Sequence, residues 1–140
     1  QANVTPSSLT NMVAVETAAT FTLSTAPTAN EFDMNTDGQL RYTGTPTQNV
    51  FFTASVMLEI DTAVVDKELV MAVTKGGTIV TGAKIGGFCP ATTVNSVPMT
   101  VSGFTSMATN DYLNIFIGNV DSTDNITARM AQLTAHTILT

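Results

Sequence analysis

The stretch from Asp37 to Ile60 constrains the fold more than any other part of the chain. In its second half every even-numbered side chain is apolar, namely Val50, Phe52, Ala54, Val56, Leu58 and Ile60. Apolar residues at period two are typical of a strand with one face in a hydrophobic core. We therefore expect a long strand here. A shorter strand at residues 39–43 precedes it, between the turns Asp37-Gly38 and Gly44-Thr45-Pro46.

The odd-numbered side chains of the long strand form a second, mixed face. Phe51 and Met57 are more apolar than a solvated face requires, whereas Thr53, Ser55 and Glu59 are too polar for the interior of a monomer. We interpret this face as one that contacts another subunit.

The rest of the chain favours a single all-β domain. Its 140 residues are enough to bury a core without metal or disulfide help, and the chain is rich in Thr and Val, with 11% charged residues and no Trp. Alternating segments between turns such as Lys75-Gly76-Gly77 predict about nine or ten strands, no helix, and an antiparallel sandwich or jelly roll. We expect residues 1–10 to form an extended N-terminal arm and residues 11–140 to form the domain.

Two segments near the C terminus support more detailed expectations. In the strand at residues 112–120, Leu113, Ile115 and Ile117 alternate with Tyr112, Asn114 and Phe116, so the first set should face the core. In an earlier strand, the Gly103-Phe104 pair indicates a bulge or a close approach of the backbone. Residues 85–97, which contain Gly86-Gly87 and Pro90, are expected to form a loop.

The charge distribution argues against nucleic acid as a partner. The net charge is −6, and the five basic residues are scattered: Arg41, Lys67, Lys75, Lys84 and Arg129. Binding to phosphate backbones requires concentrated Lys and Arg. No apolar run approaches the roughly 18 residues that span a membrane, so we expect no membrane partner. Cys89 is the single cysteine, and we interpret it as a small apolar residue.

One short motif suggests a cation site. Asp33, Asn35 and Asp37, followed by Gly38, match the first half of a calcium-binding loop. The twelfth position is Gly44, however, where such a loop has a bidentate Glu. We favour an Asp-Gly hairpin turn and expect no cofactor, and we retain the three oxygen-bearing residues as the metal candidate.

The sequence contains little that indicates catalysis. His136 is the single histidine and has no Ser or Cys partner motif, so we expect a surface or interface histidine. Asp61, Asp66 and Glu68 lie close in sequence and would be the acid and base of a glycosidase, but a solvated connection explains them equally well. We expect that the protein is not an enzyme.

Several short motifs, taken in order, resemble a known family. They are Phe32–Thr45 (FDMNTDGQLRYTGT), FxASV at 52–56, KGGT at 75–78, VSGF at 101–104, NDYL at 110–113 and NITxxxxxL at 125–133. Together they resemble the tumour-necrosis-factor-like jelly roll, also found in the globular heads of complement. The form they resemble most is common in phage and algal-virus fibre, spike and capsid-surface proteins.

The resemblance covers residues 31–139 and implies a ten-stranded jelly roll that assembles as a homotrimer about a threefold axis. Aromatic residues of the inner sheet would lie near that axis. Tyr112 and Phe116 match those aromatics, and Phe51 is expected beside them. The resulting set of expected interface residues is Phe51, Thr53, Met57, Tyr112 and Phe116.

Function then reduces to a main hypothesis and an alternative. The first is a structural protein of the virion surface, a capsid decoration, cement or head-fibre protein whose partners are capsid or fibre proteins. The alternative is the receptor-binding or glycan-binding head of a fibre or spike, with the loops 85–97 and 121–125 forming a trimeric rim.

Overall fold

The computed structural model describes residues 31–34, 39–60, 67–89, 96–120 and 126–138. These residues form eight strands and no helix, which confirms the all-β prediction. The strands are β1 (Phe32–Met34), β2 (Leu40–Tyr42), β3 (Gln48–Ile60), β4 (Lys67–Lys75), β5 (Thr78–Cys89), β6 (Ser96–Met107), β7 (Tyr112–Asn119) and β8 (Ile126–Ile138). The predicted arm at 1–10 and the first part of the predicted domain, residues 11–30, lie outside the described residues.

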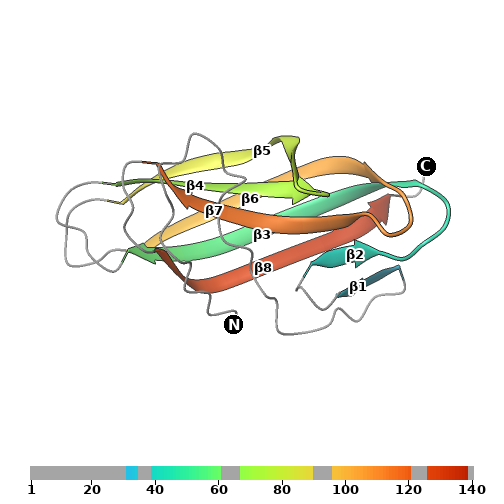
Figure 1. Cartoon of the computed structure of the whole chain (residues 1–140), viewed down its shortest axis with the longest axis horizontal. Helices are drawn as coiled ribbons and strands as arrows, with labels where there is room; N and C mark the ends of the chain where they lie inside the picture. The colour runs from blue at the N-terminus through green and yellow to red at the C-terminus, as the bar shows by residue number, and fades with distance from the viewer. Residues whose placement is uncertain (1–30, 35–38, 61–66, 90–95, 121–125, 139–140) are drawn as a thin grey trace.

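The strands form two antiparallel sheets that pack as a β-sandwich. One sheet has five strands in the order β1-β2-β7-β4-β5, and the other has three in the order β6-β3-β8. The longer strands run along the long axis of the domain, and the short β1–β2 hairpin lies near one end (Figure 1). The long central strand β3 pairs with β6 on one side and β8 on the other, so it organises the smaller sheet.

The core lies between the sheets and contains the residues that the alternation predicted. The even-numbered side chains of β3 from Val50 to Leu58 are buried, as are Leu113, Ile115 and Ile117 of β7. Lys75 pairs with Leu113 across the β4–β7 ladder, and its Nζ donates to the carbonyl oxygen of Ser106 in the other sheet at 2.9 Å. The β7 side chains in register with Lys75 therefore point into the sandwich.

The larger sheet is buried on both faces along residues 69–74 of β4 and 113–119 of β7. Opposite the core side of β4 and β7, the side chains of Val70, Ala72, Thr74, Asn114 and Phe116 are also buried. On the smaller sheet, by contrast, the outward side chains of β3 are only partly buried and those of β6 are exposed.

The segment predicted as a loop at 85–97 is partly strand. β5 continues through Gly86-Gly87 to Cys89, and β6 begins at Ser96, while residues 90–95 lie outside the described residues. A Cβ atom on Gly87 would lie 2.8 Å from Cγ1 of Val97 in β6. The glycine here allows two strands of different sheets to approach closely, which is why a turn-forming residue type occurs inside a strand.

The Gly103-Phe104 pair marks a close approach and not a bulge. The β3–β6 register is continuous from the Gln48–Met107 pair to the Glu59–Ser96 pair. Gly103 lies opposite Phe52, and a Cβ atom at Gly103 would lie 2.9 Å from Cζ of the fully buried Phe52 ring. The ring thus occupies the space that a side chain at residue 103 would need.

The close fit around Gly103 predicts how much stability is lost when one methyl group is added there. We expect Gly103→Ala to lower the free energy of unfolding by about 1–3 kcal/mol, because the confined Phe52 ring cannot move aside without strain. Urea denaturation followed by circular dichroism measures the change. Ser102→Ala, at the exposed neighbouring position, is the control and should change stability by less than about 0.5 kcal/mol. Equal stability of Gly103→Ala and the unsubstituted protein would contradict the close fit.

Candidate functional site

The candidate site is the side of the three-stranded sheet that faces away from the five-stranded sheet, called here the outer face. The strand register aligns its side chains in rows across β6, β3 and β8. An aromatic row is followed by two polar rows and a methionine row. In that order the rows are Phe104–Phe51–His136, Ser102–Thr53–Thr134, Thr100–Ser55–Gln132 and Pro98–Met57–Met130.

The aromatic row is a contiguous set of rings on the surface. The Phe51 ring lies 4.9 Å from the Phe104 ring and 5.1 Å from the His136 ring, with interplanar angles of 55° and 50°. Tilted rings at these distances attract one another. Phe51 is half-buried between its neighbours, while Phe104 remains 63% exposed. Contiguous exposed apolar surface is a candidate interaction site.

The polar rows already contain internal hydrogen bonds. The hydroxyls of Ser55 and Thr100 lie 3.0 Å apart, and Thr134 Oγ1 donates to the carbonyl oxygen of Thr53 at 3.3 Å. A hydroxyl with a protein partner loses less when water is removed than one without. These rows can therefore be covered by another surface at moderate desolvation cost.

A β-bulge in β8 brings together the ion pair of the outer face. Met57 pairs with Met130 and Leu58 with Ala128, so Arg129 is the extra residue in β8. Its Nε donates to the Glu59 carboxylate, and this hydrogen bond lowers the pKa of Glu59. No other Asp, Glu, Lys or Arg occurs in β3, β6 or β8. The formal charges on this face therefore cancel.

The structure divides the predicted interface residues between two sheets. Phe51, Thr53 and Met57 lie together on the outer face, but Tyr112 and Phe116 lie on β7 of the other sheet, which pairs with β2 and β4. The expectation that Phe51 lies beside Tyr112 and Phe116 is wrong, and Phe116 is only 9% exposed. Alternation indicates the two faces of a strand, but it does not indicate which sheet the strand joins.

Sequence reasoning missed two members of the outer face as interface candidates, Phe104 and Met130. His136, expected as a surface or interface histidine, lies exposed on this face. Phe104 had a detectable signal, because it is the single aromatic among the Ser, Thr and Pro residues at the solvent-facing positions of its strand. Met130 had none, since the bulge at Arg129 shifts the alternation of β8 before that residue.

The metal candidate is described only in part. Asn35 and Asp37 lie outside the described residues, and the Asp33 carboxylate binds the Arg41 guanidinium through two hydrogen bonds, with Nε–Oδ1 at 2.9 Å. This pairing lowers the pKa of Asp33. In the described ranges no three His, Cys, Asp or Glu side chains are grouped to hold a metal ion. Asp33 therefore stabilises the β1–β2 hairpin as an ion-pair partner.

The other chemical candidates are also only partly described. Asp61 and Asp66 lie outside the described residues, while Glu68 is exposed on β4, opposite Phe88 of β5. Cys89 is buried, as its interpretation as a small apolar residue predicted. Across the described ranges, no helix has the length and apolar character to cross a bilayer.

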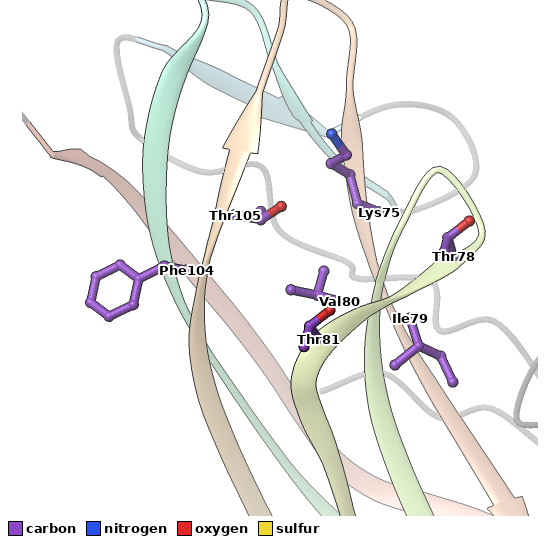
Figure 2. A pocket seen from close by; sticks show the side chains of 7 residues that line it. All are labelled: Lys75, Thr78, Ile79, Val80, Thr81, Phe104 and Thr105. Atoms are coloured by element: carbon purple, nitrogen blue, oxygen red, sulfur yellow. The ribbon is translucent and has the colours of Figure 1, made fainter.

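A small pocket lies at the edge of the sandwich where β5 and β6 approach. Its volume is about 270 Å³, and it is lined by Lys75, Thr78, Ile79, Val80, Thr81, Phe104 and Thr105. The Phe104 ring points away from the other lining side chains (Figure 2). Lys75 Nζ is held by the carbonyl oxygen of Ser106 and by Asp111 Oδ2, at 2.9 and 3.3 Å. The pocket therefore offers hydroxyl groups and an aliphatic wall beside a cation that already has partners.

No protein-family model matches the chain, and none of the curated proteins is significantly similar to it.

Proposed function

We propose that this protein is a structural component of a virion surface, a homotrimer that decorates or cements a capsid or forms a head fibre. The observation that supports this most is the outer face, where an exposed aromatic row and a methionine row lie on a long, regular sheet. In this proposal the three copies meet through their outer faces. The virion assignment rests on the motif resemblance described above.

The charge pattern supports a second copy of the same chain as the partner. Each chain has a net charge of −6, so copies repel one another over most of their surface. The outer face is the exception, since Glu59 and Arg129 neutralise each other within one chain. If the rotation axis of the trimer runs parallel to β3, each row of outer-face side chains faces the same row of the other copies. Rings then pack on rings and thioethers on thioethers, without opposing like charges.

The strand pairing supports the proposal of a jelly roll. β3 pairs with β6 and β8, and β7 pairs with β2 and β4, so four of the six strand pairings join strands that are not consecutive in sequence. Such pairing is typical of Greek-key and jelly-roll sandwiches. These folds are stabilised by packing and need no disulfide bond, which suits a chain with one cysteine.

The alternative, a glycan-binding or receptor-binding head, is favoured by the pocket between β5 and β6. Three Thr side chains and a small volume suit a neutral, hydroxyl-rich ligand. Screening the protein on a glycan array, with Thr105→Val as the matched variant, distinguishes the two functions. Loss of a specific signal in the variant would favour the receptor-binding head.

Imaging the protein in its native assembly tests the main proposal. We expect antibody labelling of purified particles to reveal threefold knobs on the shell or at a fibre tip. Protein found entirely in the particle-free fraction would contradict a structural role in the virion.

A further inference from the structure

The outer face contains an imidazole in its aromatic row. His136 is the single histidine of the chain, and its ring lies 5.1 Å from the Phe51 ring in the aromatic row. Histidine is the side chain that ordinarily gains or loses its charge between pH 5 and 8. A change of proton occupancy at this position would therefore change the charge of an otherwise neutral face.

No described carboxylate faces His136 to compensate a positive charge. On β3 the one charged residue is Glu59, eight positions beyond Phe51, or roughly 26 Å along the strand. On β8 it is Arg129, which binds Glu59, and β6 has none. The adjacent Thr137 donates to Glu31 at 2.8 Å, but alternation directs Thr137 toward the opposite side of the sheet.

We propose that His136 makes assembly sensitive to acid, so that the copies associate with a neutral imidazole and separate when it is protonated. This inference rests on the proposed trimer and identifies a way to regulate the same face. In the trimer, the imidazole is covered by apolar neighbours and lies near two identical rings. Burial and like charges both disfavour the protonated form there. Protons therefore bind preferentially to separated copies, and by linkage acid favours separation.

An attraction within each chain does not reverse this effect. A protonated imidazole is attracted to the face of the Phe51 ring. That contact is made within one chain and exists before and after assembly, so it largely cancels from the association equilibrium. The burial and the repulsion between copies arise in the trimer alone.

The size of the effect follows from the number of protons. For each proton that the separated copies bind and the trimer excludes, lowering the pH by one unit weakens association by up to about tenfold. Three histidines per trimer give a limit of about 1000-fold per pH unit. We expect the dissociation constant to rise at least about 100-fold between pH 7.5 and pH 5.0.

Sedimentation equilibrium at pH 7.5 and pH 5.0 tests the inference. The lower pH is suitable because hydrogen bonds to arginine lower the pKa values of Glu59 and Asp33. A carboxylate with a lowered pKa contributes stability that is lost only when the pH falls through that lowered value, so both ion pairs persist at pH 5.0. Circular dichroism at each pH verifies that the protomers remain folded.

Two variants test whether the pH response of assembly depends on His136. His136→Gln, which stays neutral, should be trimeric at both pH values, and His136→Lys, which stays positive, should be dissociated at both. If the unsubstituted protein has the same constant at both pH values, or if His136→Gln retains the full pH response, the acid switch is wrong while the trimer stands. If the unsubstituted protein is monomeric at pH 7.5, the proposed trimer itself fails.

Discussion

Phe104→Asp is expected to convert the trimer into folded monomers. The Phe104 ring is 63% exposed in a single chain, so its replacement removes few contacts within the protomer. In the trimer it would lie in a covered aromatic row, where a buried aromatic typically contributes about 2 kcal/mol or more. Each of three copies loses this contribution, so the dissociation constant should rise by about 10,000-fold. Sedimentation equilibrium measures the mass, which should fall to that of one 14.7 kDa chain.

Phe88→Asp is the matched control for this change. Phe88 is 61% exposed, nearly the same as Phe104, but lies on β5 of the other sheet. An aspartate there lies opposite Glu68, and like-charge repulsion should lower the free energy of unfolding of the protomer by up to about 1 kcal/mol. It should leave the trimer intact. If both variants dissociate equally, or neither does, the outer face is not the interface.

Phe52→Ala should produce the largest loss of stability on the long strand. Phe52 is fully buried and its ring fills the space above Gly103, so truncation removes apolar burial and leaves a cavity. We expect the free energy of unfolding to fall by about 3–5 kcal/mol. This is a large part of the roughly 5–15 kcal/mol by which domains are stable. Urea denaturation in the Phe104→Asp background measures it without a contribution from assembly.

Phe51→Ala, one residue earlier on the same strand, is the matched control. Phe51 is half-buried and contacts the His136 ring, so its loss should cost the isolated Phe104→Asp protomer about 1 kcal/mol. In the background of an intact outer face, the same change should instead weaken assembly. Similar losses of protomer stability from the two substitutions would contradict the assignment of one face to the core and the other to a partner.

The sequence predicted the faces of strands better than their neighbours. Alternation correctly assigned Phe52 and Leu58 of β3 and Leu113 and Ile117 of β7 to the core. It did not reveal that β7 joins β4 and β2, so it could not show that Tyr112 and Phe116 lie in a different sheet from Phe51. Sheet membership depends on pairings between residues far apart in the chain, and a period-two pattern contains no information about them.

Glycines and short motifs were difficult to interpret because their meaning depends on tertiary contacts. Gly86-Gly87 indicated a loop, but Gly87 is needed where β5 approaches Val97 of β6. Asp33 fitted half of a cation-binding pattern, but its carboxylate is bound by Arg41 from the paired strand. In each case the deciding partner is eight or more residues away, so local spacing alone could not identify it.

The most direct test of a self-associating outer face is the fluorescence of Phe51→Trp. The chain has no natural tryptophan, so this residue would report on the centre of the aromatic row without background. We predict that its emission is protected from iodide quenching at micromolar concentration and becomes accessible on dilution, as the mass falls from three chains to one. An indole equally accessible to iodide at every concentration, in a protein of constant single-chain mass, would contradict the proposed interface.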